Sequence, residues 1–152
     1  MRIRAGIVLI EDNRVALIER HRAGLHYFVF PGGGVDEGES PEQAAVREAM
    51  EELGIKVAIK QKVAEIQLGQ KSRQVYFLVY QIGGKFGTGI GEEYTDSNPQ
   101  DPDEGIYIPI WMPIDELPHH TNIHPAHVAK LVARSVQQGW EAAASVSFEE
   151  TK

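Results

Sequence analysis

The chain has 152 residues, of which 42% are hydrophobic, which is enough for one domain with an adequate core. Its formal net charge of −7 argues against a broad basic surface that would bind a nucleic acid polymer. The absence of cysteine excludes disulfides, thiolate zinc sites and cysteine nucleophiles.

No apolar run approaches membrane-spanning length, and the first apolar run is too short and too charged for a signal peptide. We therefore expect a cytoplasmic protein that does not associate with membranes. No internal repeat or second domain is visible, so residues 1–140 are expected to form a single domain. Small and polar residues follow, and residues 141–152 are expected to be a frayed tail.

Strands that lead into a glycine-rich turn are predicted at the start of the chain. Residues 2–10 and 15–19 are apolar runs on either side of a polar turn, which predicts a β-hairpin. Residues 21–26 are polar and predict a loop, and residues 27–30 predict a short aromatic strand. Pro31 and three consecutive glycines follow directly.

A helix is predicted immediately after the glycines. Ser40 is a typical N-cap residue, Pro41 is favoured at the first helical position, and Gln43 completes a capping box. The helix is expected to end near Leu53, because Gly54 can adopt the left-handed conformation that stops a helix.

The second half of the chain predicts further strands and a final helix. The loop at residues 83–103 is long for a compact domain, which is typical of a functional or mobile segment. The run at residues 74–82 predicts the central strand of the sheet. The expected elements are, in order, extended chain at 57–68, a strand at 74–82, the loop at 83–103, a strand at 106–112, a turn at 113–117 and a helix at 125–138.

The predicted first helix carries a cluster of carboxylates. At about 100° per residue, Glu48, Glu51 and Glu52 lie on one face. Like charges at these spacings repel each other, and a bound divalent cation would remove the penalty. Oxygen ligands without histidine or cysteine favour Mg²⁺, with Mn²⁺ as the alternative. The opposite, packing face is expected to comprise Val46, Ala49, Met50 and Leu53.

The glycine turn before this helix fits a phosphate-bearing substrate. Glycines let the backbone approach a ligand closely, so Gly33 and Gly34 are candidate substrate contacts, and the Gly32 carbonyl is a candidate metal ligand. Cations bound to the helix would bridge the substrate phosphates to an acidic protein. The alternative is a solvated acidic helix face behind an ordinary glycine turn.

The spacing of these residues resembles the signature of the Nudix hydrolase family, G-x5-E-x7-R-E-U-x-E-E-x-G-U, in which U is a bulky aliphatic residue. The one departure is Ala49, which is smaller than usual at the first U position and affects packing rather than chemistry. The matching residues are Gly33, Glu39, Arg47, Glu48, Glu51, Glu52, Gly54 and Ile55.

The resemblance implies an α/β/α sandwich around a mixed β-sheet, and hydrolysis of a nucleoside diphosphate linked to another group, X. It implies that Glu48, Glu51 and Glu52 bind the metal, and that Arg47 pairs with Glu39 to hold the helix and the loop in register. Candidates for the general base are Glu48 and the loop residues Glu92 and Glu93, one of which would contribute a ligand or the base. A homodimer is also plausible from the resemblance.

Substrate contacts outside the signature are less sharply indicated. Tyr27 and Phe28 lead into the glycine turn and are candidates for stacking on a nucleobase, although strand alternation places Phe28 on the same face as Phe30, and one face is expected to be core. The candidate phosphate or base contacts are Arg4, Arg20, Arg22 and Arg73.

Residues outside the signature distinguish subgroups of the family. The proline of the ADP-ribose type is missing near residues 70–72, and Tyr76 lies too late for the diadenosine polyphosphate type. By elimination we expect a MutT-like nucleoside triphosphate pyrophosphohydrolase. ADP-ribose or a nucleotide sugar is the alternative substrate. A non-catalytic nucleotide-sensing module is the alternative of another class, although the full set of glutamates favours an enzyme.

Overall fold

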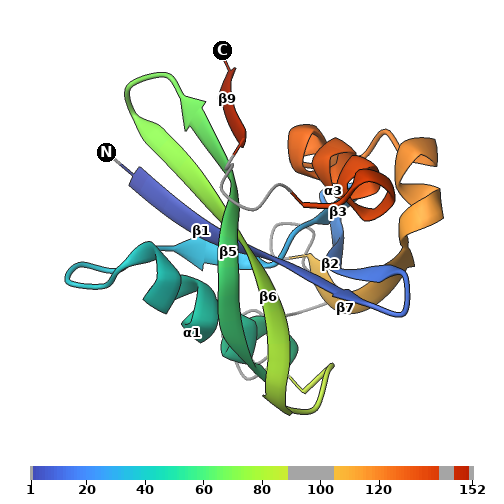
Figure 1. Ribbon diagram of the computed structural model, residues 1–152, viewed down its shortest axis with the longest axis horizontal. Helices are drawn as coiled ribbons and strands as arrows, with labels where there is room; N and C mark the ends of the chain where they lie inside the picture. Colours follow the sequence, from blue (N-terminus) through green and yellow to red (C-terminus); the bar gives the residue numbers. More distant parts are fainter. Residues whose placement is uncertain (1, 89–104, 141–145, 151–152) are drawn as a thin grey trace.

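The protein is an α/β fold in which two helical layers enclose a mixed β-sheet (Figure 1). The computed structural model describes residues 2–88, 105–140 and 146–150. Within this part, nine strands form one sheet in the order β8-β3-β2-β1-β6-β5-β9, with β4 paired to β1 and β7 paired to β2. The predicted α/β/α sandwich around a mixed sheet is confirmed.

The elements have the following bounds. The strands are β1 (Arg2–Glu11), β2 (Arg14–Arg22), β3 (Leu25–Val29), β4 (Gly32–Gly34), β5 (Ile55–Leu68), β6 (Ser72–Gly84), β7 (Ile106–Pro113), β8 (Ile123–His124) and β9 (Val146–Glu150). The helices are α1 (Pro41–Leu53), the 3-10 helix η1 (Ile114–His119) and α3 (Ala126–Gln138).

Strands β1 and β6 form the centre of the sheet. They pair in parallel from Arg2 opposite Ser72 to Leu9 opposite Val79. The β-branched and aromatic residues of both strands suit a pleated surface that is buried on both faces. The predicted hairpin of β1 and β2 is confirmed, with Asp12 and Asn13 at positive φ in a tight turn.

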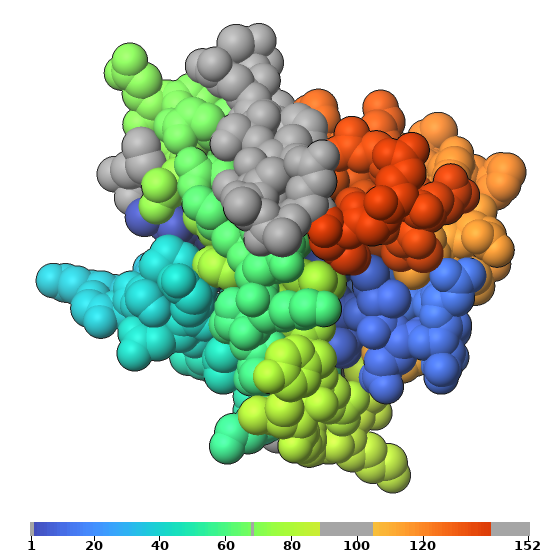
Figure 2. All heavy atoms as spheres, in the orientation of Figure 1, coloured from blue at the N-terminus to red at the C-terminus, as the bar shows by residue number. Residues whose placement is uncertain are grey.

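Two hydrophobic clusters lie on opposite faces of the sheet. Helix α1 packs through Ala45, Ala49 and Leu53 onto one face, and α3 packs through Val128 and Val132 onto the other. Figure 2 shows α1 in cyan and α3 in orange to red on opposite sides of the green strands β5 and β6. The sheet therefore separates the surroundings of the two helices.

The predicted start and stop of α1 are confirmed. The Ser40 hydroxyl accepts a hydrogen bond from the Gln43 N–H at 3.0 Å, and the Gln43 side chain accepts one from the Ser40 N–H at 2.8 Å. Gly54 has a φ of 76°, in the left-handed region. Met50, which was expected on the packing face, is exposed, because the helix turns its alanines toward the sheet instead.

Several boundaries differ from the sequence prediction because tertiary pairing overrides local composition. Of residues 21–26, predicted as a loop, 21–22 belong to β2 and 25–26 to β3, and the two strands pair around a turn at Ala23 and Gly24. Residues 114–119 form a 3-10 helix rather than a turn. Residues 146–150, expected to be frayed, form β9 in parallel with β5.

The remaining predictions on chain organisation are tested less directly. The assignment of residues 1–140 to a single domain stays a prediction. Strand β6 extends to Gly84, into the predicted loop 83–103, and residues 89–104 of that loop lie outside the described residues. No helix in the described part of the chain is long and apolar enough to span a membrane.

Candidate active site

Strand β4 brings the glycines against the carboxylates of α1. It pairs antiparallel with β1, so that Gly33 lies opposite Ala5. A Cβ atom added to Gly33 would overlap the carboxylate of Glu48. The Gly32 N–H donates a hydrogen bond of 2.6 Å to the carboxylate of Glu52. A side chain at position 33 would therefore displace the Glu48 carboxylate.

Two of the three clustered carboxylates are buried. Glu48 is 7% exposed and Glu52 is 5% exposed, whereas Glu51 remains partly exposed. Burying a carboxylate is costly unless donors or cations compensate its charge. These two glutamates thus lie between the helix and the sheet, not on a solvated helix face.

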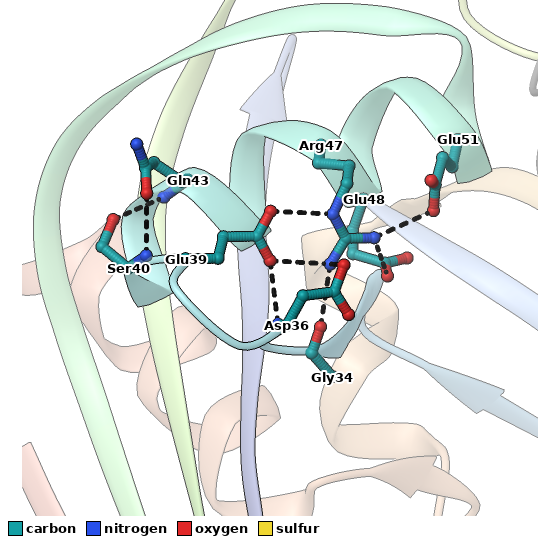
Figure 3. A network of polar contacts seen from close by, with 8 residues as sticks. All are labelled: Gly34, Asp36, Glu39, Ser40, Gln43, Arg47, Glu48 and Glu51. Carbon is teal, nitrogen blue, oxygen red and sulfur yellow. Dashed lines mark hydrogen bonds and ion pairs between the residues drawn. The ribbon is translucent and has the colours of Figure 1, made fainter.

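Arg47 supplies much of that compensation (Figure 3). Its Nε and Nη2 donate two hydrogen bonds of 2.9 Å to Glu39, so the predicted pair is present. Nη1 donates to Glu48 at 2.9 Å and to Glu51 at 3.2 Å. Nη2 also donates to the Gly34 carbonyl at 2.9 Å. One guanidinium therefore connects the loop, strand β4 and helix α1.

The hydrogen bonds of Arg47 and Glu39 also set the charge states of these two side chains. Hydrogen bonds from Arg47 and from the backbone N–H of Asp36 lower the pKa of Glu39 from 4.5 to about 2. Hydrogen bonding to Glu39, and then to Glu48, raises the pKa of Arg47. Both groups are charged at neutral pH, as a lasting ion pair requires.

A cleft of about 490 Å³ lies beside β1 and is lined by residues from both hydrophobic clusters. Arg4, whose backbone pairs with Gly34, lines one wall. Arg20 and Tyr27, from β2 and β3, line another. The remaining lining residues are Val29, Phe30, Ile66, Gln74, Tyr76, His124, Pro125 and Ala126.

Arg20 places a buried positive charge in this cleft. It is 9% exposed, and its guanidinium lies 3.6 Å from the centre of the Tyr107 ring and 5.7 Å from that of Tyr27. Among the described residues, its Nε and Nη2 atoms have no hydrogen-bond partner. The aromatic rings compensate only part of the cost of burying the charge. The cleft is therefore electrostatically suited to an anion.

Comparison with known proteins decides the family. The model of the NUDIX domain matches residues 1–133, which is most of the chain. The chain belongs to the Nudix family. A Nudix hydrolase from Nitrosomonas europaea shares the fold, with a TM-score of 0.70 over 98% of this chain and 79% of that one, at 19% identity. The resemblance and the fold class predicted from the sequence are thereby confirmed.

Two curated relatives match shorter segments. An RNA pyrophosphohydrolase from Tolumonas auensis is 53% identical over 51 residues, which are 34% of this chain and 29% of that protein. A putative 8-oxo-dGTP diphosphatase from Bacillus subtilis is 44% identical over 61 residues, 40% of each chain. The chain thus spans less than half the length of these relatives.

The Nudix residues present a donor set that suits Mg²⁺ or Mn²⁺. The side chains of Glu48, Glu51 and Glu52 offer only carboxylate oxygens. The glycine strand packs against these carboxylates without intervening Cβ atoms. Among the described residues, however, the ligand atoms of Glu48, Glu51 and Glu52 do not all lie within 4.8 Å of one another. Arg47 lies between Glu48 and Glu51 and bridges them.

The structure separates the weaker substrate candidates. Tyr27 lines the cleft, whereas Phe28 is buried in the core on the α3 side, which disfavours the predicted substrate contact of Phe28. Strand alternation explains the difference, because neighbouring residues face opposite sides. Arg73 lines a smaller depression of about 240 Å³ with Arg4 and Gly34, and forms an ion pair with Glu65 at 3.8 Å.

Other site residues could not be distinguished from the sequence alone. The sequence did not distinguish Arg4 and Arg20 from Arg22; in the structure the first two line the cleft and Arg22 does not. Gln74 and His124, which also line the cleft, had no signal as substrate contacts, because they come together only through the sheet. Glu92 and Glu93 lie outside the described residues.

Proposed function

We propose that this protein hydrolyses the phosphoric anhydride bond of a nucleoside diphosphate linked to X, with Mg²⁺ as cofactor and Mn²⁺ as a possible substitute. The observation on which this rests is the pair of buried carboxylates, Glu48 and Glu52, packed against a glycine strand in which a Cβ at Gly33 would overlap Glu48. A structural role alone would not favour burying two like charges side by side.

Each residue of the signature has a proposed role. Glu48, Glu51 and Glu52 would hold the metal, together with the Gly32 carbonyl. The chemistry that Mg²⁺ supplies when bound is polarisation of the anhydride and stabilisation of the leaving phosphate. Arg47 and Glu39 position the carboxylates through their hydrogen bonds. Glu48, Glu92 or Glu93 would accept the proton of the attacking water.

The cleft supports a small anionic nucleotide as substrate. Arg4 and Arg20 offer positive charge, and Tyr27 offers an aromatic face for a base. Arg4 lies beside β4, so phosphates of a nucleotide in this cleft would extend past Gly33 and Gly34 toward the carboxylates. A nucleoside triphosphate, as for a MutT-like enzyme, is the first candidate. ADP-ribose and nucleotide sugars are the next.

RNA is a second candidate, because one relative is named an RNA pyrophosphohydrolase. The net charge of −7 disfavours it, since a polymer is bound largely through its phosphates. We also propose a cytoplasmic location, which fractionation of cells would test. We propose a homodimer as well, which the molecular mass of the protein in solution would test.

The test is a hydrolysis screen with Mg²⁺ and with Mn²⁺. The substrates are nucleoside triphosphates, oxidised deoxynucleoside triphosphates, ADP-ribose, nucleotide sugars, dinucleoside polyphosphates and RNA with a 5′-triphosphate. Products are identified so that the bond that breaks is known. Cleavage of at least one anhydride that requires the metal is expected. A flat result across all substrates and both metals would favour the nucleotide-sensing alternative.

Glu52→Gln is the decisive variant, and Glu42→Gln is its matched control. Both glutamates lie on α1, but Glu42 is exposed in the first turn. We expect Glu52→Gln to lower kcat/KM by about 100-fold or more, because metal catalysis contributes several kcal/mol, and Glu42→Gln to retain activity. Parental activity in a folded Glu52→Gln protein would contradict the metal assignment.

A further inference from the structure

A second cluster of metal-ligating side chains lies away from the Nudix signature, on the hairpin of β2 and β3. Glu19 and His21 are two residues apart on β2, and His21 pairs with His26 of β3. Because side chains alternate along a strand, all three project from the same face of the sheet. The turn at Ala23 and Gly24 holds the strands in this register.

The three side chains already converge. The His26 Nε2 atom lies 2.7 Å from a carboxylate oxygen of Glu19, and the His21 Nε2 atom lies 3.2 Å from the same oxygen. The two imidazole rings stack with centroids 4.3 Å apart and planes 7° apart. In the part of the chain that the structure describes, no other set of three His, Asp or Glu side chains has ligand atoms all within 4.8 Å of one another.

These separations suit a metal ion. Ligands at about 2.0–2.2 Å from a tetrahedral zinc lie about 3.3–3.5 Å from each other, so only small side-chain rotations would be needed. A neutral imidazole offers the lone pair of Nε2 when its proton is on Nδ1. Strands rather than a loop carry all three ligands, which limits the entropy lost when the site closes.

The chemistry of the ligands separates this cluster from the carboxylates of α1. Two imidazoles and one carboxylate favour Zn²⁺ and related divalent transition metals, whereas oxygen-only sites favour Mg²⁺. The side chains of His21 and His26 are 44% and 48% exposed, so a bound ion would keep coordination positions open to solvent. We propose that Glu19, His21 and His26 form a binding site for Zn²⁺ that is separate from the Nudix metal site.

The position of the site gives it a consequence for the cleft. Arg20 lies between Glu19 and His21 in the sequence, and it pairs with Tyr27, the neighbour of His26. Both residues project from the opposite face of the same strands and line the cleft. A metal ion that links β2 to β3 would therefore hold these two cleft residues in register, and it would raise the thermal stability of the chain.

The test is titration of the protein with Zn²⁺ in the presence of excess Mg²⁺, which would occupy the Nudix carboxylates. Calorimetry is expected to detect one Zn²⁺ per chain, and Co²⁺ absorption reports the ligand type. His21→Ala, His26→Ala and Glu19→Gln should each weaken binding about 100-fold or more, since each removes one of three ligands. His26→Gln, which keeps a polar side chain of similar size, should do the same if the alanine variant misfolds.

Two controls make the result specific. His119→Ala removes an exposed histidine outside the cluster, and Glu52→Gln alters the Nudix carboxylates. Both should bind Zn²⁺ as the parent does. Equal Zn²⁺ affinity in the parent and in folded His26→Gln would overturn the proposal, as would the absence of Zn²⁺ uptake by the parent. Loss of binding in Glu52→Gln instead of the hairpin variants would place the ion at the Nudix carboxylates and overturn it too.

Discussion

The carboxylates of α1 and the cleft differ in how buried charge is balanced. On the side of α1, the buried carboxylates Glu48 and Glu52 accept hydrogen bonds from Arg47 and from the Gly32 N–H. In the cleft, the buried guanidinium of Arg20 contacts aromatic rings but has no anionic partner among the described residues. In the first region the chain therefore supplies hydrogen-bond donors to the buried charge, whereas in the second the described residues supply no anion to the buried charge. Stability and binding should respond separately to mutation.

The largest expected effect comes from Arg47→Met, which removes the cation but keeps a side chain of similar length. Glu39 and Glu48 would each lose a charged donor, and Glu48 is buried. We expect the free energy of unfolding, measured by urea denaturation at neutral pH, to fall by about 2–4 kcal/mol. Arg14→Met, which removes an exposed ion pair with Asp12 and a contact with the Trp111 ring, should change it by less than about 1 kcal/mol. Equal losses would contradict the difference between the two arginines.

The next largest effect is expected at the contact between strand β4 and helix α1. Gly33→Ala would place a methyl group against the Glu48 carboxylate, whereas Gly34→Ala would meet no atom within 4 Å. Because overpacking of a tight contact is destabilising, Gly33→Ala should lower the free energy of unfolding by about 1–3 kcal/mol. Gly34→Ala should lower it much less. Thermal melts of both variants make the comparison, and similar melting temperatures would contradict the close approach at Gly33.

A third variant tests the cleft. Arg20→Met removes the buried charge, so the free energy of unfolding should stay within about 1 kcal/mol of the parent, since lost ring contacts offset the removed burial cost. Substrate binding should weaken, with KM raised about tenfold and kcat little changed. Steady-state kinetics on the substrate found by the screen, with Arg14→Met as control, measure this. A loss of stability as large as that of Arg47→Met would show that other residues of the chain compensate the charge of Arg20.

The smallest effect concerns pH. The pKa of Glu39 is lowered from 4.5 to about 2, so its ionised form stabilises the fold at pH values above 4.5. That contribution is lost as the pH falls from 4.5 toward about 2, because the carboxylate is then protonated in the folded state as well. Glu39→Gln should therefore be less stable than the parent by about 1 kcal/mol at neutral pH. Urea denaturation at a series of pH values should show the difference shrinking below pH 4.5; a constant difference would argue against the ion pair.

Much of the fold could be predicted because its signals are local. The capping box of Ser40 and Gln43 and the stop at Gly54 depend on residues a few positions apart, and the structure has all of them. The parts that were missed depend on partners distant in the sequence. Residues 21–26 resemble a loop by composition, and only the pairing of β2 with β3 makes them strands. Strand β9 likewise exists only through its pairing with β5.

In the candidate site, too, the features with local signals could be predicted from the sequence and the others could not. The spacing from Gly33 to Ile55 identified the family, and it correctly predicted the pairing of Arg47 with Glu39. The same spacing could not say that Glu48 and Glu52 are buried, nor that Phe28 belongs to the core. Burial depends on the neighbouring strands, which the helical wheel of α1 does not contain.

By itself, the sequence determined the Nudix family and the local frame of the α1 carboxylates, because one turn and one helix carry that information in fixed spacings. The tertiary structure alone decided which arginines face a common cleft and that Glu19, His21 and His26 meet on one hairpin face. These groups come from separate strands, and strand register sets which side chains become neighbours. The balance of charge at the α1 carboxylates and in the cleft is likewise a property of the folded chain.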